Sequence, residues 1–265
     1  MVKNTFKFIV MPLIIASSCS AAVAGRIETT DVAFGVDPRV ELVSIIFRLS
    51  GNEEYNVPMI SSYDHDVDNH FKSFIDHPAV KFAGELARTK GIGFDGPIWM
   101  AIHLKNSFSP RKDINFPQSL IASDSRWSTE DAKKFAALAE KFAKDTAFDA
   151  FFVQHRILYT TAESRMQEMF KTDVRLSWFQ RFFGKQPGTT FHAIPGMLTG
   201  GQSYGPSVKT TDGHRDIYAV ITIYSDNQDL PNFSEEARHI AAHEFIHAYT
   251  NPVTDKFASK LGRSQ

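Results

Sequence analysis

The stretch that organises this chain reads SEEARHIAAHEFIH and occupies residues 234–247. Ser234 is a favourable helix N-cap, and the two glutamates that follow it favour the first turn of a helix. His243 and His247 are four residues apart, so a helix places both imidazoles on one face, about 6 Å apart along its axis. We expect one helix that begins near Ser234 and ends before Asn251-Pro252, because proline disfavours helical geometry in the residue before it.

His243, Glu244 and His247 form the pattern HExxH. Both imidazoles of such a helix can bind one Zn²⁺ at about 2.0–2.1 Å, and the glutamate can take a proton from a water on the metal. The pattern predicts a zinc site in which His243 and His247 are ligands and Glu244 is the catalytic base. The competing interpretation is a chance match on a helix whose histidines face solvent or hydrogen-bond locally.

A catalytic zinc usually has three protein ligands, and the spacing leaves the third one open. Asp255 follows His247 by eight residues, and it could approach the metal if the chain folds back after the helix. His239 extends the four-residue repeat, but it lies about 12 Å from His247 along a helix axis, which is too far for one tetrahedral site. His192 and His214 are upstream alternatives.

The rest of the chain predicts an α+β fold. Asp37 followed by Pro38 is typical of a helix start, and so is Ser128 before a run with helical spacing. Ile217–Tyr224 is the clearest strand, because it is rich in β-branched and aromatic residues. We expect a helical N-terminal portion, a small β-sheet and then the HExxH helix, with this strand at a sheet edge where an extended peptide can pair.

Residues 1–24 are predicted to form a secretory signal peptide. Two lysines precede the apolar run Phe8–Ala16, which is too short to span a bilayer, and Ala22-Val23-Ala24 is a typical cleavage signal. Two interpretations of Cys19, the single cysteine, stay open: it is removed with the signal, or it is the lipidated first residue of a bacterial lipoprotein. We expect an exported protein, periplasmic or extracellular, with one domain over residues 25–265. It contacts a membrane only if Cys19 is lipidated.

The composition is that of a globular protein and argues against one class of partner. Of the 265 residues, 43% are hydrophobic and 22% are charged. The net charge of −1 gives no electrostatic basis for binding nucleic acid. Phenylalanine is frequent, at 23 residues, which predicts an aromatic-rich core.

The segment from His243 to Pro252, HEFIHAYTNP, resembles a bacterial family of exported zinc metallopeptidases that share HExxHxxxNP. Gln202–Pro206 and Val36–Leu42 also resemble parts of that family. The resemblance implies a zincin-like fold of the gluzincin type, in which a glutamate on a following helix is the third zinc ligand. This chain ends before such a helix, so we expect a truncated domain without its C-terminal helices, an incomplete site, or a different ligand.

The motif and the resemblance together predict a zinc-dependent metallopeptidase that hydrolyses a peptide or protein substrate with metal-activated water. Tyr204, on a glycine-flanked loop, is a candidate donor to the oxyanion that develops in the reaction, and its competing interpretation is an ordinary turn aromatic. The alternative function is a catalytically impaired relative that binds peptides or has a structural role in the envelope. The third zinc ligand distinguishes the two functions.

Overall fold

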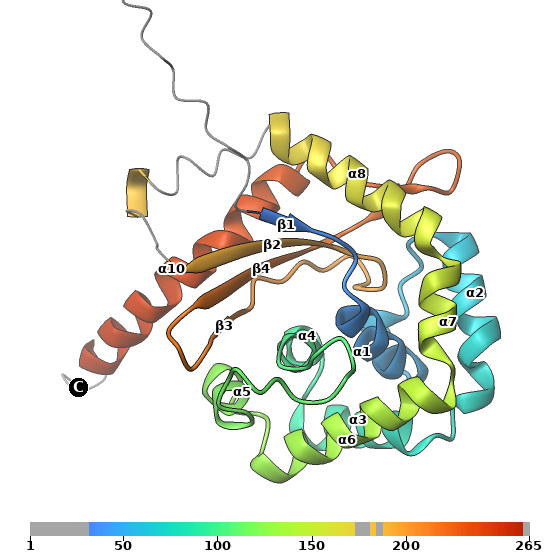
Figure 1. Ribbon diagram of the computed structural model, residues 1–265, viewed down its shortest axis with the longest axis horizontal. Helices are drawn as coiled ribbons and strands as arrows, with labels where there is room; N and C mark the ends of the chain where they lie inside the picture. Colours follow the sequence, from blue (N-terminus) through green and yellow to red (C-terminus); the bar gives the residue numbers. More distant parts are fainter. Residues whose placement is uncertain (1–31, 173–180, 184–187, 262–265) are drawn as a thin grey trace, which may run out of the picture.

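The computed structural model describes residues 32–172, 181–183 and 188–261. Figure 1 shows a body of helices from the N-terminal part of the chain, a small sheet beside it, and the long helix α10 on the far side of the sheet. The predicted α+β class is confirmed, and so is its order, with the helical portion first and the HExxH helix last. The predicted signal peptide and Cys19 lie outside the described residues.

The helices and strands have the following bounds, each set in chain order. The helices are α1 (Pro38–Leu49), α2 (Ser61–Phe71), α3 (Pro78–Lys90), α4 (Asp95–Ile102), α5 (Gln118–Ser123), α6 (Thr129–Asp145), α7 (Phe148–Gln154), α8 (Arg156–Thr172) and α10 (Ala237–Leu261), with 3-10 turns η1 (Glu53–Tyr55) and η2 (Lys72–Phe74). The strands are β1 (Val32–Phe34), β2 (Thr189–Gly196), β3 (Ser207–Lys209), β4 (Arg215–Thr222), β5 (Tyr224–Ser225) and β6 (Pro231–Asn232). Within the described ranges, no helix is both long enough and apolar enough to cross a membrane.

The four-stranded sheet has the order β1-β2-β4-β3. β1 and β4 both run parallel to β2, and β3 runs antiparallel to β4. β1 and β2 are direct neighbours although α1 to α8 separate them in sequence, so the helical body is an insertion between two paired strands. β4 lies between β2 and β3, so the prediction that Ile217–Tyr224 forms a sheet edge is wrong. The edge consists of β3 and the segment Ser203–Pro206 before it, which is bridged to β4.

Side chains of the sheet alternate between two hydrophobic clusters. On one face, Phe191 and Ala219 pack with Phe245 of α10 and with residues of α8. On the other face, Tyr218 and Val220 pack against the helical body. Burial on both faces explains why β4 has a nearly continuous apolar sequence. The sheet thus separates α10 from the helical body, and a cavity can border on both of them only at a sheet edge.

Two helix starts that the sequence predicts are confirmed at the level of hydrogen bonds. The Asp37 side chain accepts a hydrogen bond from the Arg39 amide at 2.8 Å, and Pro38 is the first residue of α1. The Ser128 hydroxyl accepts one from the Asp131 amide at 3.0 Å at the start of α6. Each cap satisfies an amide that has no partner within its own helix.

The HExxH motif lies on α10, as predicted, but this helix is longer than predicted. It begins at Ala237, three residues after Ser234, and it continues through Asn251-Pro252 to Leu261. The predicted end before Asn251-Pro252 is therefore wrong. A proline inside a helix removes one backbone hydrogen bond, but it kinks many helices without ending them.

Glu41 of α1 is fully buried in the helical body, where a carboxylate is costly. The Tyr63 hydroxyl donates to its Oε2 at 2.9 Å, and the Met197 amide donates to its Oε1 at 3.3 Å. Tyr63 also shares a 2.7 Å hydrogen bond with the hydroxyl of Tyr159. Burial raises the pKa of Glu41 from 4.5 to about 8, although the hydrogen bonds from Tyr63 and Met197 oppose the shift. Glu41 is thus mostly protonated at neutral pH.

Glu41→Gln is expected to remove part of the dependence of stability on pH. Between pH 4.5 and about 8 the folded protein keeps a proton on Glu41 that the unfolded chain has lost, so the free energy of unfolding falls as the pH rises. Glu41 contributes a slope of at most about 1.4 kcal/mol per pH unit in this range. Urea unfolding at several pH values measures the slope. The exposed Glu85→Gln is the control that keeps it, and an unchanged slope in Glu41→Gln would contradict the buried proton.

Candidate functional site

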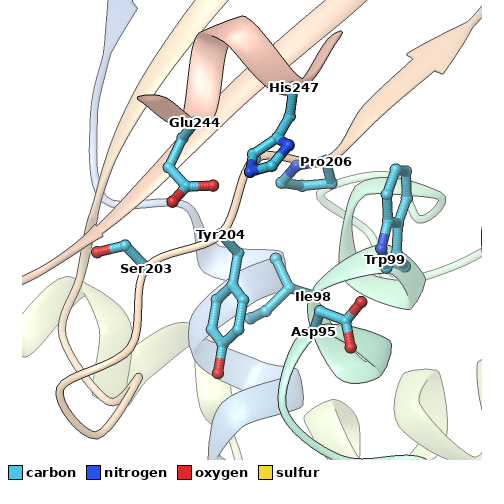
Figure 2. Close-up of a pocket in the computed structure, with 9 residues that line it drawn as sticks. Asp95, Ile98, Trp99, Ser203, Tyr204, Pro206, Glu244 and His247 are labelled. Atoms are coloured by element: carbon cyan, nitrogen blue, oxygen red, sulfur yellow. The ribbon is translucent and has the colours of Figure 1, made fainter. Parts of the chain in front are cut away.

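A cleft of about 290 Å³ opens where α10, the sheet edge and α4 meet. Figure 2 shows Glu244 and His247 pointing into it from α10, with Asp95 and Trp99 of α4 on the opposite side. The sheet edge lies between these two walls. The residues that line the cleft are Asp95, Ile98, Trp99, Ser203, Tyr204, Gly205, Pro206, Glu244 and His247.

His243 and His247 turn their imidazoles toward each other. Their Nε2 atoms are 2.9 Å apart, and the ring planes are at 85° with centroids 4.5 Å apart. Two nitrogens that bind one zinc ion at 2.0–2.1 Å with tetrahedral geometry are about 3.3–3.4 Å apart. The observed 2.9 Å is also a hydrogen-bond distance between the two rings, and a ring rotation would let both nitrogens face one zinc ion.

Glu244 lies between the two histidines in sequence and is 8% exposed. Its carboxylate points into the cleft on the same side as His247 (Figure 2). Burial raises the pKa of Glu244 above its usual value, while the nearby His247 and His243 oppose the shift. A carboxylate with a raised pKa is a better proton acceptor than one in open water.

The sheet edge passes very close to Glu244. Tyr204 and Val220 exchange two backbone hydrogen bonds of 2.9 and 2.8 Å, which fix the register of the edge segment on β4. The next residue, Gly205, then faces α10. A Cβ atom at Gly205 would lie 2.4 Å from the carbonyl oxygen of Glu244 and 2.8 Å from its Oε2. Only glycine permits this approach of strand to helix.

Tyr204 lines the cleft, but its hydroxyl is not placed as an oxyanion donor. The register that turns Gly205 toward α10 turns Tyr204 to the other face of the sheet, because successive side chains of a strand alternate. Figure 2 shows the ring extending away from Glu244 and His247. The hydroxyl is buried and has no hydrogen-bond partner among the described residues. The predicted oxyanion role therefore lacks support.

The two candidates for a third ligand on the motif helix are not brought to the histidine pair. Asp255 belongs to α10, so the expected turn back toward the metal does not occur. Eight residues of helix place its backbone about 12 Å beyond His247 along the axis. His239 is separated from His247 by the same length of helix, and its Nε2 lies 3.4 Å from the Arg238 Nε.

The two upstream candidates lie on the opposite face of the sheet. His192 follows Phe191, which packs on α10, so the His192 side chain faces the helical body. It stacks on Tyr218 at 4.5 Å and lies 3.2 Å from Asp216 Oδ1. His214 is 3.6 Å from the same oxygen. Among the described residues, no group of three or more His, Cys, Asp or Glu side chains is arranged to hold a metal ion.

Sequence reasoning missed the wall that α4 contributes. Asp95, Ile98 and Trp99 belong to a turn-rich stretch followed by an apolar run, which indicated only a loop and a buried segment. Arg126 fixes this wall, because its guanidinium donates to Asp95 Oδ1 at 2.7 Å and to the Asp124 carboxylate. An acid and a tryptophan at the start of an apolar run were the available signal in the sequence.

Fold and site together define an α+β protein that carries an HExxH helix on one face of its sheet. Residues 32–264 match the family described as "Domain of unknown function (DUF4932)", and the chain belongs to this family. No curated protein and no solved structure matches the chain. The family description states no activity, so the function has to be argued from the site itself.

Proposed function

We propose that this protein is an exported zinc-dependent metallopeptidase, related to the zincin-like enzymes that its motif resembles. One observation carries the proposal: the Nε2 atoms of His243 and His247 lie 2.9 Å apart, and His247 lines the cleft into which the Glu244 carboxylate points. A chance HExxH match would not require the motif to border a cleft.

His243 and His247 would hold the metal, and the described residues supply no third ligand. A bound zinc ion would polarise the substrate carbonyl and lower the pKa of a water molecule. Glu244 would accept a proton from that water as it attacks and later deliver the proton to the leaving amine.

The sheet edge beside Glu244 supports a peptide as the substrate. The backbone groups of Tyr204 pair with β4, so those of Ser203 and Gly205 point away from β4, as alternation along a strand requires. An extended peptide can form backbone hydrogen bonds with such an edge. The edge available to a peptide is therefore the segment Ser203–Pro206 beside the cleft, and not Ile217–Tyr224 as the sequence predicted.

The second candidate function is a catalytically impaired relative that binds peptides without cleaving them. The observation that favours it is the lack of a third metal ligand among the described residues. Two imidazoles alone bind zinc more weakly than three protein ligands, which would leave the edge and the cleft as a peptide-binding surface.

Metal analysis of the full chain tests the proposal. The wild type, purified with zinc present, is expected to retain one zinc ion per chain, and His243→Ala is expected to lose it. His239→Ala is the matched control, since it removes an imidazole from the same helix one turn earlier and should keep the metal. A wild-type protein that retains no zinc would refute the metallopeptidase, and one that retains zinc but cleaves no peptide in a mixed library would favour the second function.

A further inference from the structure

A second pocket, of about 590 Å³, lies next to the cleft. Phe94 and Gln202 line it, and the residues that follow each of them in sequence, Asp95 and Ser203, line the cleft. The two cavities therefore share a boundary formed by two continuous backbone segments. The residues that line the second pocket are Gly51, Asn52, Glu53, Glu54, Val57, Phe94, Gly200 and Gln202.

Phe94 has an unusual conformation at this boundary. Its backbone has a φ of 51° and a ψ of −109°, which favours glycine, and its side chain is 56% exposed. Such a conformation costs a non-glycine residue about 1–3 kcal/mol and persists only where the surroundings impose it. The Phe94 amide donates to Glu54 Oε1 at 2.9 Å, and its carbonyl accepts from the Tyr55 hydroxyl at 2.6 Å. The protein thus holds an exposed ring in a strained position without burying it in the core.

The loops around Phe94 interlock at glycines, so the pocket is already formed. A Cβ atom at Gly200 would lie 1.6 Å from the Glu54 carbonyl oxygen, and one at Gly93 would lie 2.4 Å from Glu54 Oε1. At Gly200 the two backbones can approach this closely only without a side chain, whereas at Gly93 the neighbour is the Glu54 side chain. A pocket held in this way needs little ordering when a ligand binds, which favours affinity.

The residues that line the second pocket favour a positively charged side chain as its ligand. Glu53, Glu54, Phe94 and Val57 all line one cavity, and no cationic residue from the described part of the chain lines it. Aromatic faces and carboxylates both attract guanidinium and ammonium groups, and an aliphatic group packs on the methylene stem of such a side chain.

A separate observation comes from the boundary itself. The Tyr204 hydroxyl is buried without a hydrogen-bond partner among the described residues, and Tyr204 as a whole is only 9% exposed. Burial raises the pKa of Tyr204, and the negative charges of Glu54 and Asp95 add to the shift. The phenol therefore stays neutral beside two carboxylates, with an oxygen that is able to accept a hydrogen bond.

We propose that the second pocket is a substrate subsite that binds an arginine or lysine side chain of the peptide held in the cleft. This inference rests on the proposed peptidase function for the identity of its ligand as a peptide. Phe94 acts as a positioning surface for the cation, Glu53 and Glu54 supply the charge, and Val57 contacts the stem.

Pairs of peptides that differ only in arginine or citrulline test the subsite, because citrulline keeps the shape and removes the charge. The pair is placed in turn at each position of a peptide that the wild type cleaves. At one position, the wild type is expected to cleave the arginine peptide about tenfold faster than the citrulline peptide. The Glu244→Gln protein is expected to bind the arginine peptide about tenfold more tightly than the citrulline peptide. Glu53→Gln and Phe94→Gly should each reduce the preference for arginine over citrulline to about threefold or less, both in the cleavage rate and in the binding affinity.

Two controls separate recognition from folding. Glu85→Gln makes the same charge change on an exposed part of α3 and should keep the full ratio. Phe94→Gly relieves the strained backbone, so its melting temperature should equal or exceed that of the wild type. A lower melting temperature would assign the ring a structural role.

The outcomes distinguish the subsite from the peptidase function. If the wild type cleaves peptides with equal rates for arginine and citrulline at every position, the subsite is refuted and the peptidase stands. If it cleaves none, but Glu244→Gln binds arginine peptides selectively and Glu53→Gln removes the selectivity, the peptidase is refuted and the subsite stands. If it neither cleaves nor binds peptides, both are refuted.

Discussion

Replacing Glu244 by glutamine is expected to lower peptide hydrolysis by about 100-fold or more, the range found for the loss of a general acid–base group. A glutamine would keep the size and most of the packing of a side chain that is 8% exposed, but its amide cannot accept the proton of the attacking water. The histidine pair remains intact, so the zinc content should not change. Steady-state cleavage of a fluorogenic peptide and metal analysis of the same samples measure both effects.

The control for this prediction is Glu235→Gln, an exposed carboxylate just before the same helix, which should keep wild-type activity. Full activity in Glu244→Gln would show that Glu244 is not the catalytic base. Loss of zinc together with activity would instead show that the carboxylate maintains the metal site and would leave its role as a base unsupported.

Enlarging Gly205 is expected to damage both fold and activity. A methyl group there would lie 2.4 Å from the Glu244 carbonyl oxygen and 2.9 Å from the carbonyl carbon, so either the edge segment or α10 has to move. Overpacking of this kind costs about 1–3 kcal/mol. A displacement of Glu244 by about 1 Å would lower catalysis by about 100-fold. Gly205→Val should lower both the free energy of unfolding and the rate of peptide cleavage more than Gly205→Ala does. Urea unfolding and a peptide cleavage assay measure the two effects.

Gly84→Ala is the matched control, because a Cβ atom at Gly84 comes no closer than 3.5 Å to Ser50 and lies inside a helix. This change should leave activity intact and stabilise the protein by up to about 1 kcal/mol. Wild-type stability and activity in Gly205→Val would show that the contact between the sheet edge and α10 can relax without consequence.

Features that depend on a few neighbouring residues could be predicted from the sequence. Asp37 and Ser128 start helices because each caps an amide two or three residues ahead. The facing rings of His243 and His247 follow from a spacing of four residues on one helix. These predictions needed no knowledge of the distant parts of the chain.

Features that depend on distant partners could not be predicted. The central position of β4 is set by its pairing with β2 and β3, and a strand sequence does not show whether one side or both will be paired. The direction of Tyr204 depends on the register of its bridge to Val220, since a shift of one residue reverses every side chain. The α4 wall with Asp95 joins the site only through tertiary packing.

The cleft is bounded by elements that belong to different hydrophobic clusters. Phe245 of α10 belongs to the cluster on one face of the sheet, whereas Tyr55 and Ile98, near the opposite walls, belong to the cluster of the helical body. The loops around Phe94 therefore pack in a different cluster from α10, although Phe233 contacts both clusters. We therefore expect sequence differences among relatives to concentrate at residues 51–57 and 91–96 and to spare residues 243–247.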